Sequence, residues 1–382
     1  TWNILPNLSY KANFGYDNSD GVTRTSVDPN TPGFATNIPG NQGYARIANR
    51  YLTTTTLEHT LNYKLDLGKN KIDALAGFSY QKFERSGTSF SIDGISAQGV
   101  GVKPSINPGF AGTQSGTTGY AQENELQSYF GRLNYSFDNR YLLTASMRGD
   151  GSTRFGKNNK YGYFPSFALG WNIANESFLK ESSTLNNLKL RASWGQTGNQ
   201  EVENKITQAS YSLSGADGYY LYDDLNLVNG VSVNRTPNPD LKWEVVTQFN
   251  VGLDFNLWND KLYGTLDYFN KTTTDAILNV PSQALSPTTT IWTNIDGKII
   301  NKGIEFMLGS KIVDTKNFSW NTNVVFGQTK TVITELPVPS YQSGPDGLFF
   351  IKKGETYGAI YGYDWVKSLD QMSKQLPAGK SI

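Results

Sequence analysis

The chain has 382 residues and carries 34 Lys and Arg against 33 Asp and Glu, so its formal net charge is +1. This balance gives no basic surface of the kind that nucleic-acid binding requires. The chain has no cysteine and a single histidine, His59, which excludes disulfides, cysteine-ligated zinc and two-histidine metal sites. No run of about 18 apolar residues occurs, so a transmembrane helix is excluded as well.

Long segments in which apolar and polar residues alternate with period two are the main signal, and this period is typical of β-strands with one apolar face. The clearest segment is 243–257, where Phe249, Val251 and Leu253 alternate with Asn250 and Asp254. Such runs exceed the roughly 5–6 residues of a typical soluble strand. In chain order, the predicted strands lie near 7–16, 51–66, 71–85, 125–137, 140–149, 160–174, 187–196, 241–257, 261–275, 303–312 and 317–331.

The connections between these strands alternate between short and long. The short ones lie near 67–70, 138–139, 258–260 and 313–316, with a somewhat longer one at 175–186, and the long ones lie near 17–50, 86–124, 150–159, 197–240 and 276–302. In an up-and-down antiparallel sheet, successive connections fall on opposite ends. The short connections are therefore expected at one end of the sheet and the long connections at the other. Short turns at one end and long extracellular loops at the other are typical of outer-membrane barrels.

A soluble β-sandwich also alternates apolar and polar residues, but it has shorter strands and Greek-key crossovers. The pattern therefore favours an all-β fold, an antiparallel up-and-down transmembrane β-barrel. We expect one face of the 243–257 strand to contact lipid and the other to line the lumen. The expected lipid-facing residues are Phe249, Val251, Leu253 and Phe255, and the expected lumen-facing residues are Gln248, Asn250, Asp254 and Asn256.

Two further patterns have a simple structural interpretation. Arg148 to Ser152 reads Arg-Gly-Asp-Gly-Ser, but it lacks the lysine and the following helix of a phosphate-binding loop, so we interpret it as a strand end that enters a loop. Tryptophans near strand ends are interpreted as membrane-interface anchors, because amphipathic rings gather there. They are Trp171, Trp194, Trp243, Trp258 and Trp320.

Residues 128–199 resemble the signature region of SusC/RagA-like TonB-dependent transporters of the bacterial outer membrane. The resemblance is carried by SYFGRLNYSFDNRYLLTASMRGDGSTRFGKNNKYGYFPSFALGWNIANESFL, followed by LNNLKLRASWGQTGNQ. Further matches are NPDLKWEVVTQFNVGLDFNLWNDKLYGTLDYFNKTTTDAIL at 238–278, NKGIEFMLGSKI at 301–312 and EHTLNYKLDLGKNKIDALAGFSYQ at 58–81. Together these matches span most of the chain.

The resemblance implies that residues 1–382 form about half of a 22-stranded barrel. It implies an N-terminal plug with a TonB-contacting segment before residue 1 and closing strands after residue 382. It further implies coupling to TonB–ExbB–ExbD through the plug, a SusD-like surface lipoprotein that acts as a lid, contact with outer-membrane lipid, and a glycan or peptide as substrate. No cofactor is implied. The long extracellular loops are expected near 17–50, 86–124, 197–240 and 276–302.

The candidate binding residues lie in the long loops, because an importer first holds its ligand on the extracellular side. Aromatic rings and carboxylates suit a sugar or peptide ligand, and they are concentrated at Tyr219, Tyr220, Tyr222, Asp223 and Asp224, with Trp292 added from the next long loop. The alternative interpretation is that these side chains only pack the loops. A paired-carboxylate catalytic site is disfavoured, since adjacent residues of an extended chain point in opposite directions.

Two functions remain open at this stage. The first is TonB-dependent active import of a nutrient, a glycan, oligosaccharide or peptide, across the outer membrane. The second is a surface adhesion or glycan-binding barrel without transport. An enzyme is not expected, because no nucleophile or acid–base constellation is visible.

Overall fold

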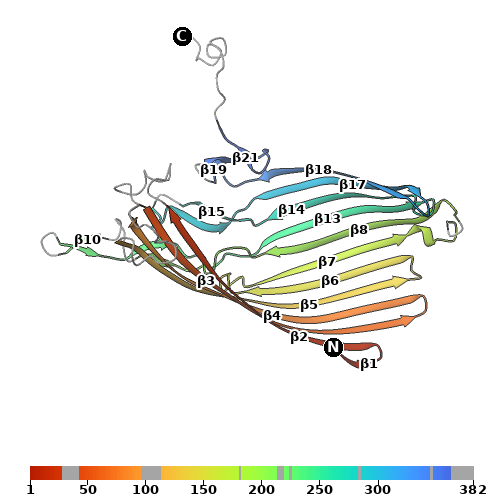
Figure 1. Ribbon diagram of the computed structural model, residues 1–382, viewed down its shortest axis with the longest axis horizontal. Helices are drawn as coiled ribbons and strands as arrows, with labels where there is room; N and C mark the ends of the chain where they lie inside the picture. The colour runs from red at the N-terminus through yellow and green to blue at the C-terminus, as the bar shows by residue number, and fades with distance from the viewer. Residues whose placement is uncertain are drawn as a thin grey trace, which may run out of the picture.

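A computed structural model describes residues 1–27, 43–95, 113–179, 182–212, 219–222, 226–282, 285–344 and 347–362. Within these ranges, twelve strands form one antiparallel sheet in which every strand pairs with its neighbours in chain order (Figure 1). They are β1 (Trp2–Leu5), β2 (Leu8–Val27), β3 (Gly43–Leu67), β4 (Asn70–Ile95), β5 (Thr113–Phe137), β6 (Tyr141–Ser152), β7 (Tyr161–Asn172), β8 (Leu185–Asn199), β13 (Glu244–Leu257), β14 (Leu262–Thr274), β17 (Lys298–Asp314) and β18 (Ser319–Glu335). The predicted up-and-down antiparallel order is confirmed.

Smaller strands occupy the long connections and the segment after β18. They form the pairs β9 (Ser210–Ser212) with β12 (Ser232–Arg235), β10 (Tyr219–Tyr222) with β11 (Asn226–Asn229) and β15 (Ile277–Pro281) with β16 (Thr290–Asn294), and the three-stranded unit β19 (Ser340–Ser343), β20 (Phe349–Lys352) and β21 (Ala359–Ile360). One short 3-10 helix, η2 (Ile173–Asn175), follows β7. Across the described residues, no helix has the length and apolar character needed to span a membrane.

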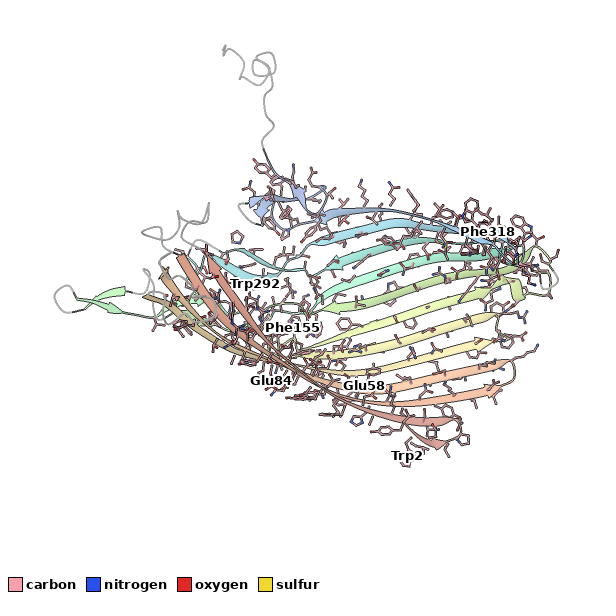
Figure 2. The ribbon with its side chains drawn as sticks, viewed as in Figure 1. Trp2, Glu58, Glu84, Phe155, Trp292 and Phe318 are labelled. Atoms are coloured by element: carbon pink, nitrogen blue, oxygen red, sulfur yellow. The ribbon has the colours of Figure 1, made fainter. Side chains whose placement is uncertain are left out.

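The two ends of the sheet differ as the connection lengths predict. The short turns lie together at one end, which we call the turn end, and the long connections lie together at the other, the loop end (Figure 1). Figure 2 shows Phe318 at the turn end and Phe155 and Trp292 toward the loop end. The tight turn between β5 and β6 uses left-handed backbone: Asp138 and Asn139 both have φ of 52°, as a hairpin β-turn that matches strand twist requires.

Strands β2 to β5 extend well beyond their predicted bounds at the loop end. Residues 17–27, 43–50, 86–95 and 113–124, which we had expected in long loops, are paired in register as strands. Many of them are Ser, Thr, Asn and Gly on both faces, so no apolar alternation marks them as strand. The predicted loops near 17–50 and 86–124 are therefore shorter, and their remaining residues lie outside the described ranges.

Directly paired residues share a face of an antiparallel sheet, so the register defines both faces. One row across eight neighbouring strands is apolar or aromatic throughout: Phe137, Tyr141, Trp171, Leu190, Leu253, Leu266, Phe306 and Phe326. Many of these side chains are exposed, with Leu266 at 45 % and Phe326 at 56 %. A contiguous exposed apolar surface of this extent requires an apolar environment. We call it the apolar face, and it includes the predicted lipid-facing residues of β13.

The opposite face, the polar face, holds charged and amide side chains. On β13 it includes Asn250, which pairs with Ser193, and Asp254, which binds the guanidinium of Arg191 at 2.7 and 2.9 Å. The same guanidinium also reaches Asp267 on β14, with its closest N–O distance at 3.1 Å. The predicted division of the two faces of β13 is confirmed.

Gly252 allows Arg191 to reach across a whole strand. It lies in register between Arg191 on β8 and Asp267 on β14, and a Cβ added at Gly252 would come within 2.3 Å of the Asp267 carboxylate and 2.8 Å of the guanidinium. Any other residue here would therefore displace the ion pair. The glycine makes room for a charge-assisted link across three strands, a stronger contact than one between neutral groups.

A buried carboxylate joins the elements at the turn end. Glu176, which follows η2, accepts hydrogen bonds from the Tyr141 hydroxyl at 2.7 Å, the Trp171 indole at 3.0 Å and the Arg140 guanidinium at 2.8 Å. These hydrogen bonds hold the pKa of Glu176 below its ordinary value of 4.5, because each of them favours the charged form. The β7–β8 connection is thereby fixed to the neighbouring β5–β6 turn.

The apolar face generates a prediction for β13. Val251→Arg should destabilise the protein in a bilayer by about 2–4 kcal/mol if residue 251 lies near the midplane, whereas Asn250→Arg on the polar face should cost much less. Reversible unfolding of the intact protein in lipid vesicles measures both values. Equal costs for the two variants would contradict the assignment of the faces.

The Glu176 contacts predict a pH dependence of stability. A carboxyl with a lowered native pKa stabilises the fold above its ordinary pKa, and this contribution is lost as the pH falls through the native value. Glu176→Gln should therefore be less stable than the wild type at neutral pH, and the difference should shrink below pH 4.5. Unfolding in vesicles across this pH range tests it, with the exposed Glu203→Gln as control. A difference that does not change with pH would contradict the interpretation.

Candidate functional site

A small hydrophobic core fixes the long connections at the loop end. Phe155, Phe164, Ile206, Leu241 and Trp243 are all buried and in contact, although they come from three separate parts of the chain. The ring centroids of Phe155 and Trp243 are 4.8 Å apart, and those of Phe164 and Trp243 are 5.5 Å apart. We call these five residues the loop core. Trp243, which we had interpreted as an interface anchor, is 6 % exposed and is a core residue instead.

Hydrogen bonds reinforce the loop core. The Trp243 indole donates to the Lys160 carbonyl at 3.0 Å. The buried Arg154 donates to the Gln200 carbonyl at 2.9 Å and to the Asn204 amide oxygen at 3.1 Å, which joins the 153–160 connection to the 200–243 connection. Since a buried guanidinium is stable only when it is paired in this way, the two connections are held together as one unit.

The NPDLKWE segment, Asn238 to Glu244, supplies much of this unit. Asn238 donates to the Trp292 carbonyl at 2.9 Å, and the Asp240 carboxylate accepts from Asn158 at 2.7 Å. Its Leu241 and Trp243 lie in the loop core. Residues 241–243, which we had predicted as the start of a strand, therefore connect the loops, and β13 begins at Glu244.

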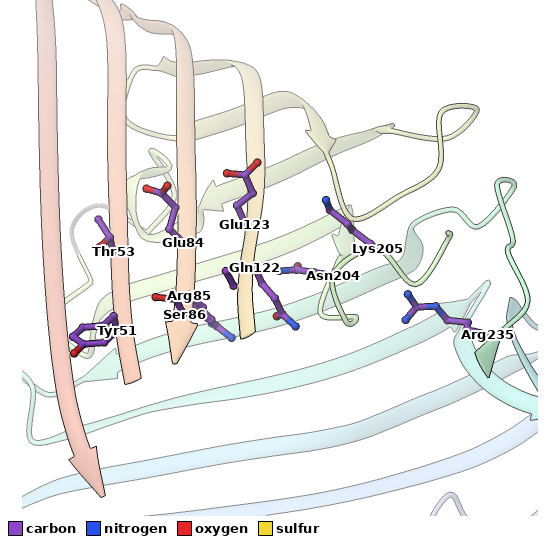
Figure 3. A pocket seen from close by; sticks show the side chains of 11 residues that line it. Tyr51, Thr53, Glu84, Arg85, Ser86, Gln122, Glu123, Asn204, Lys205 and Arg235 are labelled. Atoms are coloured by element: carbon purple, nitrogen blue, oxygen red, sulfur yellow. The ribbon is translucent and has the colours of Figure 1, made fainter. Parts of the chain in front are cut away.

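A polar pocket of about 630 Å³ lies between strands β3, β4 and β5 and the 200–243 connection (Figure 3). Strand residues on one side include Tyr51, Glu84 and Glu123, and the connection contributes Lys205 and Arg235. Its volume falls within the roughly 300–1,000 Å³ of small-molecule sites. The strand side of the pocket is built on the extensions of β3 to β5 beyond their predicted ends.

The two carboxylates of the pocket would repel each other without a cation between them. Glu84 and Glu123 are directly paired in register on β4 and β5, and Lys82 lies 2.8 Å from Glu84 and 3.4 Å from Glu123. The hydrogen bond to Glu84 raises the pKa of the Lys82 ammonium, because it favours the charged form. One lysine thus balances part of the charge of two carboxylates.

The opposite side of the pocket carries positive charge. The guanidinium of Arg235 donates from Nε to the Gln208 carbonyl at 3.0 Å, which fixes its position on the connection, and Figure 3 shows Lys205 and Arg235 across from the two strand carboxylates. Arg85 adds a positive group from β4 on the strand side. Positive and negative groups in one pocket can bind a polar or charged ligand through charge-assisted hydrogen bonds. Among the residues described, no cluster of three or more His, Cys, Asp or Glu could hold a metal ion.

Among the sequence-predicted site residues, Trp292 does not line this pocket. Tyr219, Tyr220 and Tyr222 lie in β10, which pairs with β11 as a hairpin that projects beyond the sheet in Figure 1. Asp223 and Asp224 lie outside the described residues. Trp292 lies in β16 and packs against the loop core. Whether any of these six residues contacts a ligand stays a prediction.

The residues that line the pocket were missed by the sequence interpretation, although one signal for them exists. On β4 the apolar face continues through Phe78 and Tyr80 and then changes to Lys82 and Glu84 at the same spacing. A switch from aromatic to charged residues on one face marks the point where a strand leaves the apolar layer. Lys205 and Arg235 carry no comparable signal, because the folding of the connection brings them there.

Two other interpretations from the sequence concern the ends of the strands, one at the loop end and one at the turn end. The Arg148 to Ser152 segment forms the last residues of β6, so it is a strand end that enters a connection, as expected. Arg148 pairs with Asp150 on the same strand at 2.7 Å. The predicted anchors Trp171, Trp258 and Trp320 are exposed by 37, 51 and 52 %, which fits side chains that contact the membrane interface.

A meander with a wide apolar face, a polar opposite face and all long connections at one end defines the wall of an outer-membrane β-barrel. The sequence model of the family described as "TonB dependent receptor-like, beta-barrel" matches residues 1–371. The chain therefore belongs to the TonB-dependent receptor family, and the resemblance inferred from its motifs is confirmed. Proteins of this family reside in the bacterial outer membrane, and we assign the chain to that membrane.

Two relatives have similar sequences. The chain is 32 % identical over 378 residues to TonB-dependent receptor P3 of Formosa agariphila, covering 95 % of this chain and 36 % of that protein. It is 32 % identical over 355 residues to TonB-dependent receptor SusC of Bacteroides thetaiotaomicron, covering 93 % of this chain and 33 % of the relative. The chain thus spans about a third of the length of these relatives.

A solved structure agrees with this assignment. The chain superposes on a chain of the structure titled "Structure of the RagAB peptide transporter" with a TM-score of 0.77 and 27 % identity, covering 93 % of this chain and 38 % of that one. The outer-membrane transporter YddB of Escherichia coli, at 12 % identity and a TM-score of 0.51, shares the fold alone.

Proposed function

We propose that this chain forms part of the barrel wall of an importer. The importer would move a nutrient (a glycan, oligosaccharide or peptide) across the outer membrane by TonB-dependent transport. The observation that carries the proposal is the combination of a charged polar face with a structured pocket at the loop end. A wall that only anchored a surface module would not need charged groups along its polar face. The named relatives, a SusC receptor and a RagAB peptide transporter, support the same class.

The partners follow from this proposal. A SusD-like surface lipoprotein would cover the loop end as a lid, where the loop core holds the connections in place beneath it. TonB–ExbB–ExbD would act through a plug domain, and the polar face would line the lumen in which the plug lies. The proposal includes no chemical step on the substrate.

A surface adhesin or glycan-binding barrel without transport is the alternative. Such a protein would use the loop-end pocket but would not depend on energy from the inner membrane. Uptake and surface binding by cells that carry or lack TonB distinguish the two functions. Binding without TonB-dependent uptake would favour the adhesin.

The pocket generates a prediction for ligand affinity. Lys205→Ala combined with Arg235→Ala should weaken uptake at least about tenfold at limiting ligand, because each lost charged partner typically costs on the order of 1–2 kcal/mol. Uptake is measured separately with a defined oligosaccharide mixture and a defined peptide mixture. The control pair, Lys69→Ala with Lys316→Ala, lies in turns at the opposite end. Unchanged uptake of both mixtures, at normal abundance in the outer membrane, would remove the pocket from the proposal.

The aromatic and acidic cluster at 219–224 generates a separate prediction. If Tyr219, Tyr220, Tyr222, Asp223, Asp224 and Trp292 contact substrate or the lid lipoprotein, Tyr220→Ala combined with Asp223→Ala should weaken uptake without lowering barrel abundance. Uptake and co-purification of the lipoprotein are the two measurements. If both stay at wild-type level, this cluster only packs the loops.

A further inference from the structure

The apolar face has a depression where β4, β5, β6 and β7 run side by side. It has a volume of about 610 Å³, and its lining includes Tyr129, Met147, Tyr161, Tyr163 and two glycines, Gly131 and Gly149. The four large side chains are 47 to 65 % exposed. We call this depression the tyrosine groove.

The two glycines create the groove by their positions in the register. Gly149 is paired with Tyr129 and Tyr163, so it lies between two large side chains. Gly131 is paired with Met147 on β6 and with the small Ala76 on β4, so the floor stays low on that side. A Cβ at Gly149 would come 3.1 Å from the Tyr163 ring, which therefore lies low over that strand. A Cβ at Gly131 would meet nothing nearer than the Leu75 carbonyl at 3.8 Å, so Gly131 is an open part of the floor.

The groove lies at the loop-end margin of the apolar layer. On β5 the residues of the apolar face from Tyr129 to Phe137 are Tyr, Gly, Leu, Tyr and Phe, and the next residues on the same face are Gln127, Glu125 and Glu123. This apolar length of nine residues along the strand is what a tilted strand needs to span a membrane. The groove therefore opens toward lipid, just below the membrane interface.

Hydrogen-bonded polar groups mark the interface end of the groove. The Tyr161 hydroxyl donates to the Gln127 amide oxygen at 3.1 Å, and the Gln127 amide nitrogen donates to the Tyr129 hydroxyl at 2.7 Å. Tyrosines with apolar rings and hydrogen-bonded hydroxyls suit the level where acyl chains meet headgroups. The groove thus has an apolar body and one polar end.

The surroundings limit what can fill the groove. Its walls are apolar and the bilayer around it holds almost no water, so water cannot fill it. An empty groove would leave exposed ring and thioether atoms without contacts on one side. The groove is continuous with the apolar face that the membrane covers. We propose that the tyrosine groove is a lipid-binding site that holds one acyl chain, with the lipid headgroup beside Gln127 and Tyr161.

The inference is tested by filling the groove in the intact protein. Gly131→Ile adds side-chain atoms where the structure has space for a Cβ, and Ala145→Ile is the matched control, since Ala145 lies on the same face in the row of Leu133 and Phe167. Each protein is placed in nanodiscs of palmitoyl-oleoyl-phosphatidylglycerol. Native mass spectrometry then counts the lipids that stay bound as the collision energy rises.

The wild type and Ala145→Ile should retain one lipid at energies that strip the rest, and Gly131→Ile should lose this lipid. Heat-modifiable migration on gels shows that each barrel is folded. Equal retention by wild type and Gly131→Ile, with both folded, overturns the proposal. A loss of self-association in Gly131→Ile with unchanged lipid retention also overturns it, because the occupant would then be a second copy of the chain.

Discussion

Every backbone amide and carbonyl inside a bilayer must find its hydrogen-bond partner within the protein, because lipid tails offer none. For the strands between the two edges of the sheet, this requirement is met by one continuous ladder from β1 to β18, in which strands that follow one another in the sheet order also follow one another along the chain. The two faces, the positions of the connections and the path of Arg191 over Gly252 all depend on the register of that ladder. The ladder is therefore the element on which the other features rest.

The loop end adds a second kind of stability, one that does not depend on lipid. Trp243 and its neighbours make a dry core outside the apolar layer, and Arg154 closes it with buried hydrogen bonds. A connection that is already ordered loses less conformational entropy when a ligand binds. The polar pocket benefits from this order, because Lys205 and Arg235 belong to the 200–243 connection that the loop core holds in place.

The sequence predicted the features that repeat along the chain. Alternation in segments such as 243–257 predicted the strands, their order and the faces of Phe249 and Asn250, because the apolar layer imposes that pattern on every strand that crosses it. It did not predict the extensions of β2 to β5, which lie beyond the apolar layer and are rich in Ser, Thr, Asn and Gly. Trp243 was misassigned for a related reason, since the same residue type serves an interface and a buried core.

The site was harder to predict than the fold. Lys82, Glu84 and Glu123 could have been found from the change of residue type along one strand face. Lys205 and Arg235 could not, because their position depends on how a long connection folds back over the sheet. Contacts between segments far apart in sequence leave no periodic trace in either segment.

Because β4 and β5 extend beyond the apolar layer, the same two strands contribute to the lipid-facing surface and to the polar pocket. The same strands carry Phe78 and Tyr129 toward lipid and Glu84 and Glu123 toward the pocket. A single inserted or deleted residue between these positions would turn one set to the wrong face, since side chains alternate with every residue. Ligand preference on this side of the pocket is therefore free to diverge by substitution, while changes of length are confined to the connections.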